Sequence, residues 1–378
     1  MLKLPPLALY VHIPWCVRKC PYCDFNSHQA AGALPEAEYV RALIADLDSE
    51  RERAQGRRFG SVFIGGGTPS LFSAPAIAAV LAAADRRIGF TPDAEITLEA
   101  NPGTADADNF RGYRAAGVNR LSIGVQSFSD THLTALGRIH SGGEALRAFD
   151  LARAAGFENI NLDLMHCLPG QTPAQAAADL EQAIALAPEH LSWYQLTIEP
   201  NTLFYRKPPQ LPDEAVLDAI NTAGATLLDR AGYRQYEVSA HARDGRHSRH
   251  NVNYWEFGDY IGIGAGAHGK LTDPDAGCIR RRRKVRHPRD YLARRGDHCA
   301  EEQILDVADL PLEFLMNALR LNAGVPASHF GERAGLPLAT IAEYWGKLAC
   351  QGLVMPLGEQ LTATRLGHRF LDTVLAAF

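Results

Sequence analysis

Six short apolar segments rich in β-branched residues recur along the first half of the chain, and each has the length of a β-strand. They lie at 7–14, 60–66, 94–100, 120–127, 159–166 and 190–198. Between them, apolar residues follow the i, i+3, i+4, i+7 spacing of a helix that buries one face, as at 36–55 and 172–188. This alternation ends with a helix over about 213–231 and favours a parallel sheet covered by helices. Eight strand–helix units close a full barrel, so six predict an α/β fold with a partial (βα)6 barrel.

The pattern changes after about residue 237. The segment 238–300 is rich in glycine, histidine and aromatic residues, and from about 301 the pattern is helical, followed by two short strands and a last helix. We therefore expect a partial barrel over 1–237, an extension over 238–300, and a small C-terminal winged-helix-like α+β domain over 301–378.

Composition narrows the functional class. A chain of 378 residues that is 46% hydrophobic and 21% charged can bury a large core. The net charge of -5 gives no bulk attraction to nucleic acid or to an anionic membrane. We find no secretory cleavage signal and no apolar run long enough to span a bilayer, which predicts a cytoplasmic protein. Seven cysteines in such a chain are expected to be reduced, and clustered ones are more often metal ligands than disulfides.

Three of these cysteines, Cys16, Cys20 and Cys23, follow the first predicted strand closely. A closed tetrahedral zinc site needs four ligands, so zinc would require His12 or His28 as well. Cysteine thiolates also hold iron–sulfur clusters, and three ligands on a four-iron cluster leave one iron open to a small molecule. The spacing alone leaves both metal centres open.

Polar residues stand at the ends of the following strands. The second strand ends in "GGGTP" at 65–69, and Glu99, Gln126 and Asp163 lie at or near the ends of the third, fourth and fifth. Each alone is more often a hydrogen-bonded core residue. Together they predict one mouth beside the cysteines, because the active site of a βα barrel forms where the strand C-termini meet. Arg138, which follows the fourth strand, could pair with a carboxylate.

The spacing Cys-x3-Cys-x2-Cys, with Tyr22 before the last cysteine, resembles that of the radical S-adenosylmethionine (SAM) superfamily. A closer resemblance covers roughly residues 8–270 and rests on the segments "YVHIPWC", "GGGTP", "EANP", "GVQSF", "LGRIH" and "LDLMHCLPGQT". In these segments the chain resembles the oxygen-independent coproporphyrinogen III oxidases and their relatives, the HemW haem chaperones.

The resemblance implies a 4Fe-4S cluster on the three cysteines and a SAM site beside it. The cofactor-binding residues that it implies are Tyr10, Tyr22, Gly66, Gly67, Thr68, Glu99, Gln126, Arg138 and Asp163. We assign the SAM carboxylate to Arg138, its ammonium group to the glycine run and Glu99, and its ribose hydroxyls to Gln126 and Asp163.

Two departures from the oxidase pattern favour the HemW branch. Phe25 stands where the oxidases usually have a further cysteine, and only nine residues precede Tyr10. The segment "HNVNYW" at 250–255 also matches that branch. It implies that His250 binds haem iron, with Tyr254 and Trp255 against the porphyrin edge. His247 and His268 remain rival ligands, and a hydrogen-bonded loop histidine is the alternative without haem.

The predicted function is therefore that of a haem chaperone, which passes haem to respiratory proteins and associates peripherally with the inner membrane. The competing function is an enzyme, an oxygen-independent coproporphyrinogen III oxidase, which we consider less favoured. The basic run 280–284 is usually a solvated face, but it could hold haem propionates or an anionic membrane. The tail from 301 lacks a dense basic helix, so we expect partner docking and no nucleic acid. The sequence leaves a homodimer open.

Overall fold

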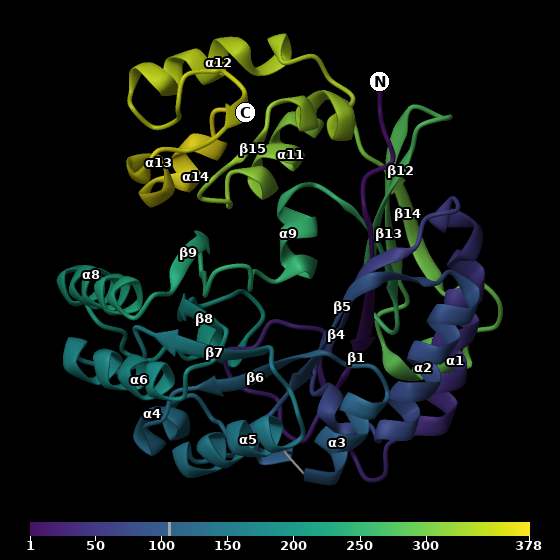
Figure 1. The fold of residues 1–378 in the computed structure, drawn as a ribbon, viewed down its shortest axis with the longest axis vertical. Coiled ribbons are helices and arrows are strands. Elements are labelled where there is room, and N and C mark those ends of the chain that lie inside the picture. The colour runs from purple at the N-terminus through teal and green to yellow at the C-terminus, as the bar shows by residue number, and fades with distance from the viewer. Residues whose placement is uncertain (105–106) are drawn as a thin grey trace.

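The computed structural model describes residues 1–104 and 107–378, and their main feature is one twelve-stranded sheet (Figure 1). At its centre lie six parallel strands that neighbour one another in chain order. These are β1 (Leu7–Ile13), β4 (Phe59–Gly66), β5 (Phe90–Ala100), β6 (Arg120–Gln126), β7 (Ile160–His166) and β8 (His190–Gln195). The sheet curves without closing, and the predicted partial barrel is confirmed.

Helices cover the outer face of this barrel (Figure 1). They are α1 (Glu36–Glu50), α2 (Ala74–Arg87), α3 (Ala107–Ala115), α4 (Asp130–Ala135), α5 (Gly142–Ala154), α6 (Pro173–Ala185) and α8 (Glu214–Arg230). The short α7 (Leu203–Arg206) lies instead against the cysteine loop, where the Phe204 amide donates to the Pro21 carbonyl. Short 3-10 turns lie at Arg51–Ala54, Pro69–Leu71 and Pro102–Thr104. The Ser73, Ser141 and Thr172 side chains cap α2, α5 and α6 by accepting a backbone N–H of the first turn, so the sequence itself fixes where these helices begin.

Each barrel strand alternates between two environments. In β6, Leu121, Ile123 and Val125 belong to the hydrophobic core under the helices, whereas Ser122 and Gln126 face the barrel interior. The same alternation holds in the neighbouring strands, where the interior positions are again mostly polar. Because successive side chains of a strand point to opposite faces, the outward face supplies stability and the inward face is free to carry chemistry.

The extension adds four strands to the sheet on the far side of β1. They are β11 (Asp259–Ile263), parallel to β1, followed by the antiparallel β12 (His268–Asp273), β13 (Cys278–Lys284) and β14 (Cys299–Ile304). Buried Asp259 accepts hydrogen bonds from Lys270 and Thr272 of β12 and from Arg57, which fastens the added strands to the barrel. At the opposite edge of the sheet, β10 (Ala240–Ala242) pairs with β8, and β9 (Arg234–Glu237) is the last strand.

The basic run forms strand β13, and its cations are paired. Arg281 donates to Glu313, Arg282 to Glu302, and Arg283 to Glu301. Lys284 is buried and pairs with Asp46 and Glu50 of α1. The run is therefore neither a simple solvated face nor a set of free cations for propionates or lipid, because carboxylates of the same chain already neutralise it.

The C-terminal residues form a second hydrophobic core around Phe314, Phe330 and Trp345, to which Tyr236 and Phe257 of the preceding segments also contribute. Its elements are α11 (Leu310–Ala318), β15 (Val325–Pro326), a π-helical turn Phe330–Ala334, α12 (Ala339–Cys350), β16 (Gln360–Leu361), α13 (Arg365–Arg369) and α14 (Leu371–Leu375). We expected two short strands after α12. Instead β16 pairs with β15, from before that helix, and 354 meets 363 only in an isolated bridge.

Helix α9 (Arg249–Trp255) lies between the barrel and this C-terminal core (Figure 1). It contacts the strands β1 and β4 on one side and α11 on the other. The remaining elements are β2 (Trp15–Cys16), β3 (His28–Gln29) and α10 (Pro288–Ala293). The domain limits at 237/238 and 300/301 stay a prediction, and β14 crosses the second of them. Within the described residues, no helix combines the length and apolarity needed to span a bilayer.

Candidate functional site

The three cysteines lie on the loop that leaves β1 at the C-terminal end of the barrel strands. Cys16, Cys20 and Cys23 are free, partly exposed thiols, and all three line one cavity of about 300 Å³. Burial raises the pKa of the Cys16 and Cys23 thiols. Three thiols that face one cavity fit a cluster held by three thiolates. Within 1–104 and 107–378, no three His, Cys, Asp or Glu side chains are arranged as ligands of a single metal ion.

The cysteine loop is fastened at its base by Asn26. Its Nδ2 donates to the carbonyls of Ala265 and Arg286, at 2.9 and 2.8 Å, and its own carbonyl lies 2.9 Å from His12 Nε2. Lys19 Nζ donates to two further carbonyls within the same loop. The loop therefore rests on the end of β1 and on the extension, so the thiols are held before any cluster binds.

The glycine run at the end of β4 passes directly beneath this loop. Gly66 has φ +117°, and a Cβ there would come within 2.6 Å of the His12 ring. A Cβ on Gly67 would come within 2.5 Å of the Trp15 carbonyl oxygen, which accepts from the Thr68 amide. Only glycine fits at these two positions, and the close approach exposes strand-end backbone to the cavity.

Two carboxyl groups form the floor of the cavity. Glu99 Oε2 accepts from the Gly66 amide at 3.0 Å, and Asp163 accepts from Ser122 Oγ and Asn161 Nδ2 at 2.9 and 2.8 Å. Burial, together with the nearby Asp163 charge, raises the pKa of Glu99 to about 8. Burial also raises the pKa of Asp163, although the hydrogen bonds that its carboxylate accepts act to lower it. The floor therefore favours a cationic ligand, which would compensate both carboxylates.

Gln126 is held toward the cavity by a strained backbone. It has φ +67° at the irregularity in the pairing of β6 with β7, a conformation that non-glycine residues adopt rarely. Its Oε1 accepts from the Tyr194 hydroxyl at 2.7 Å. This hydrogen bond fixes the orientation of the Gln126 side-chain amide and does not use its nitrogen.

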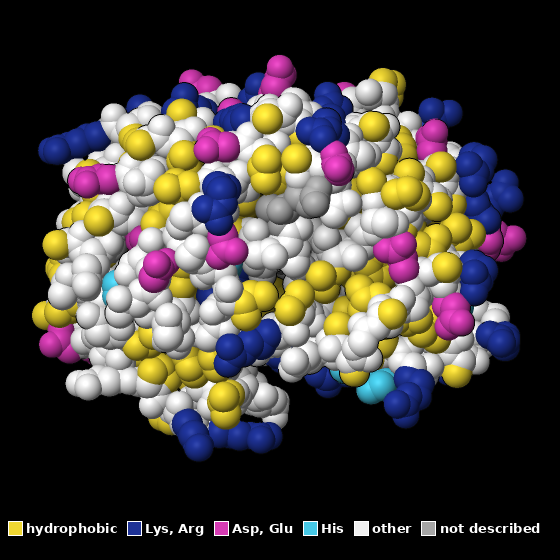
Figure 2. All heavy atoms as spheres, turned by 90° about the horizontal axis from the view of Figure 1, so that it is seen from below, with side chains coloured by type: hydrophobic (Ala, Val, Ile, Leu, Met, Phe, Trp, Pro, Cys, Tyr) yellow, Lys and Arg dark blue, Asp and Glu magenta, His cyan; other side chains and the backbone are white. Residues whose placement is uncertain are grey.

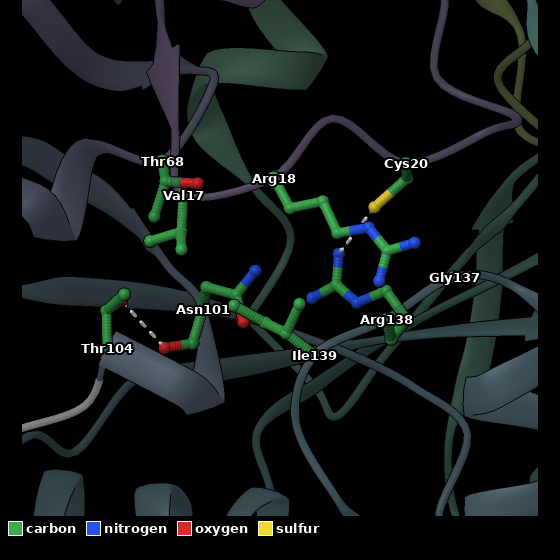
Figure 3. A pocket seen from close by; sticks show the side chains of 9 residues that line it. All are labelled: Val17, Arg18, Cys20, Thr68, Asn101, Thr104, Gly137, Arg138 and Ile139. Carbon is green, nitrogen blue, oxygen red and sulfur yellow. Dashed lines mark hydrogen bonds between the residues drawn. The ribbon is translucent and has the colours of Figure 1, made fainter. Parts of the chain in front are cut away.

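Arg138 stands on the opposite wall, beside the cysteines (Figure 3). Its Nη1 donates to Cys20 Sγ at 3.7 Å and its Nη2 to the Gly124 carbonyl at 2.8 Å, whereas its Nε is shielded from solvent without a partner. The cavity thus has a cation on one wall and carboxyl groups on its floor. This distribution of charge fits a zwitterion with a carboxylate at one end and an ammonium at the other, as SAM has.

The structure brings most of the predicted site residues together around this cavity. Its lining includes Cys16, Cys20, Tyr22, Cys23, Gly66, Gly67, Thr68, Glu99, Gln126, Arg138 and Asp163. Tyr10 does not belong to the lining. It lies deeper in the barrel, where its hydroxyl is 2.8 Å from His12 Nδ1 and its ring stacks on Phe63.

His250 lies away from the cavity, on α9 at the opposite end of the barrel strands. It is 1% exposed, and its two ring nitrogens lie 3.1 Å from the hydroxyls of Ser61 and Tyr254. Burial lowers its pKa to about 3. Trp255 packs under the Arg320 guanidinium. In the described structure the "HNVNYW" segment thus packs the barrel against the C-terminal core, and neither His250 nitrogen is open to a ligand.

Beyond the predicted site residues, the lining of the cavity contains nine others, which are Arg18, Phe25, Ser27, Pro69, Ala100, Asn101, Ser122, Gly124 and Tyr194. Tyr194 stands near the end of β8 and could have been found by extending the strand-end argument to the sixth strand. Ser122 and Asn101 follow from the inward positions of β6 and from the turn after β5. Arg18 has no signal of this kind, because loop geometry decides where its side chain points.

Comparison with known proteins agrees with this geometry. Residues 10–183 match the Radical SAM superfamily, and residues 305–370 match the HemN C-terminal domain. The chain is 51% identical to "Heme chaperone HemW" of Escherichia coli (strain K12), over 100% of this chain and 99% of that protein. It is 49% identical to the protein of the same name from Haemophilus influenzae, over 100% and 99%.

A solved structure shows the same fold. Coproporphyrinogen III oxidase (HemN) from Escherichia coli, described as a radical SAM enzyme, superposes with a TM-score of 0.83. It is 24% identical and covers 99% of this chain and 90% of its own. At that identity the similarity establishes the fold alone, and the function has to be argued from the site residues.

Proposed function

The chain belongs to the HemW family of haem chaperones, and on that premise we propose that it binds haem and hands it to haem-requiring proteins. The observation that carries this proposal is the 51% identity to a haem chaperone over essentially the whole of both chains. The radical SAM match implies a 4Fe-4S cluster and SAM. The cavity supports both cofactors, because it combines three thiols with a cation on one wall and two carboxyl groups on the floor, which suit the two charged ends of SAM.

For the cofactors, we propose that Cys16, Cys20 and Cys23 hold the cluster. Arg138 binds the SAM carboxylate, and the glycine run with Glu99 receives the ammonium group. Gln126 and Asp163 take the ribose hydroxyls, with Tyr22 beside the cluster. When bound, the cluster supplies an electron for reductive chemistry on SAM. The chain's own residues orient the ligand in the cavity.

For haem iron, we propose His268 as the axial ligand in preference to His250. An axial ligand needs a nitrogen that the iron can reach, and both His250 nitrogens are engaged in a buried site. His268 is exposed at the start of β12, at the barrel end that carries the cysteine loop. His247 is also exposed, but its ring stacks on Tyr236 with centroids 4.1 Å apart.

The partners are proposed from the same premise. We propose haem-accepting respiratory proteins as recipients, a cytoplasmic location and a peripheral contact with the inner membrane, and we leave a homodimer as an outcome for sedimentation measurements. The basic run of β13 lends the membrane contact no support, because the chain's own carboxylates neutralise its cations.

The second candidate function is oxygen-independent coproporphyrinogen III oxidase, favoured by the fold shared with HemN. One experiment separates the two. The cluster-reconstituted chain is incubated with coproporphyrinogen III, SAM and a reductant, and separately with haem and an apo-cytochrome. Haem transfer without protoporphyrinogen formation supports the chaperone, whereas protoporphyrinogen formation overturns it in favour of the enzyme.

Haem titrations identify the ligand. The His268→Ala variant should lose the Soret shift of a nitrogen-ligated haem, and the His250→Ala variant should keep it if it folds. A normal spectrum in His268→Ala together with a lost shift in folded His250→Ala would return the assignment to His250.

A further inference from the structure

Two guanidinium groups face each other where the cavity opens. Figure 3 shows Arg18, from the cysteine loop, and Arg138, from the segment after α4, with their planar groups side by side near Cys20. Both line a small pocket that shares Thr68 and Asn101 with the larger cavity. Among the described residues, no carboxylate belongs to the lining of this small pocket, whose charged side chains are the two arginines.

Arg18 has no carboxylate partner among the described residues, unlike several arginines of the chain. Within residues 1–104 and 107–378 it has no hydrogen bond, ion pair or ring contact in the structure, although its neighbour Arg138 carries the same charge. By contrast, Arg281 and Arg283 of β13 each pair with a glutamate. Two like charges held close repel each other, and an anion bound between them would remove that repulsion.

The surroundings of the pair add neutral donors and apolar surface. The Asn101 side-chain oxygen accepts from the Gly103 amide at 3.3 Å, and Figure 3 shows its amide nitrogen on the side of the guanidinium groups. Val17 and Ile139 flank the pair, and they are 44% and 46% exposed. Figure 2, which views this end of the barrel, shows hydrophobic side chains gathered around a central hollow, with Lys and Arg among them.

We propose that Arg18 and Arg138 together form a binding site for the carboxylate of an amphipathic ligand. Planar guanidinium groups match a carboxylate through paired N–H donors. The exposed apolar side chains beside them suit a ligand with an apolar body. The proposal rests on the proposed function for its two sources of carboxylate, which are the methionine end of SAM and a propionate of haem.

The test variant is Arg18→Gln, with Arg206→Gln as the matched control. Arg206 is an exposed cation of α7, outside both pockets, so its loss removes one charge without touching the site. SAM affinity is measured by equilibrium dialysis of the cluster-reconstituted full chain, and haem affinity by Soret titration. Decarboxylated SAM and haem dimethyl ester, which lack the respective carboxylates, are titrated in parallel.

An exposed arginine that pairs with a carboxylate should contribute about 1.5- to fivefold in affinity. Arg18→Gln should therefore weaken SAM or haem by that factor, leave the matching carboxylate-free analogue unchanged, and differ from Arg206→Gln. A loss confined to SAM assigns the site to the methionine carboxylate, and one confined to haem assigns it to a propionate. Equal affinities of Arg18→Gln and Arg206→Gln for both ligands would overturn the proposal. If the wild-type chain binds no haem, the proposed function fails, while the SAM titration still decides the role of Arg18.

Discussion

The buried carboxyl of Glu99 predicts how SAM affinity depends on pH. With a pKa of about 8 in the free protein, raised by burial and by Asp163, Glu99 is mostly protonated at pH 7. An ammonium group placed against it favours the ionised form, so binding at pH 7 must first remove that proton. Because pH 7 is one unit below the pKa of Glu99, removing the proton costs about 1.4 kcal/mol of binding free energy. Above the pKa, Glu99 is already ionised and this cost disappears.

The direction and the size of the pH effect on SAM affinity follow from this pKa. As pH rises from 7 to 9, the SAM affinity of the wild-type chain should rise about tenfold relative to that of Glu99→Gln. Glu99→Gln has no proton to lose, so its affinity should lack this increase. At pH 9 the variant should be weaker by roughly 1.5–3 kcal/mol, the usual size for a hydrogen bond with a charged group. Titration of the ligand's own amine occurs with both proteins and cancels in the comparison.

The assay is equilibrium dialysis of SAM with the anaerobic, cluster-reconstituted chain at half-unit steps of pH. Asp163→Asn provides an internal check, because removing its charge should lower the pKa of Glu99 and move the increase to lower pH. The same pH profile in wild type and Glu99→Gln would refute the reasoning, since Glu99 could not then be the group that titrates.

Three further predictions concern the cluster, the SAM carboxylate and α9. Cys16→Ala should abolish the iron and sulfide content after anaerobic reconstitution. Cys350→Ala, which alters an exposed thiol far from the cysteine loop in sequence, should retain about four irons and four sulfides per chain. A wild-type chain that holds one zinc ion and no sulfide would contradict the cluster assignment. Arg138→Ala should weaken SAM binding by roughly 1.5–3 kcal/mol at unchanged iron content, and an unaltered dissociation constant would remove Arg138 from the site. His250→Ala should lower the free energy of unfolding by about 2–4 kcal/mol in denaturant titrations, because it empties a buried position and leaves two hydroxyls without their partner; unchanged stability would argue against the packing role.

The barrel and its mouth could be predicted because their signals are local. Strand and helix periods are visible in the sequence, and parallel strands bring residues such as Glu99 and Asp163 to one edge without any knowledge of side-chain contacts. Tyr10 departs from this rule because it lies in mid-strand, paired with Phe63, one layer below the strand-end glycines.

The extension could not be predicted from local signals. Arg281 and Arg283 look like a solvated run, but carboxylates brought up by α11 and β14 turn the run into a strand inside a sheet. Pairing across distant segments decided the structure there, and charge neutralisation cannot be seen before the partners are known. The position of His250 is a similar case, since only the packing of α9 between two cores shows that its nitrogens are engaged.

The most direct test of the account is haem transfer by the intact chain. Haem-loaded, cluster-reconstituted protein is mixed with an apo-cytochrome, and the haem spectrum of the acceptor is followed after the two proteins are separated. The account predicts that the acceptor gains haem at the expense of the chain, and that the His268→Ala variant, unable to ligate haem, transfers none. An acceptor that stays empty while the same preparation converts coproporphyrinogen III to protoporphyrinogen would contradict it.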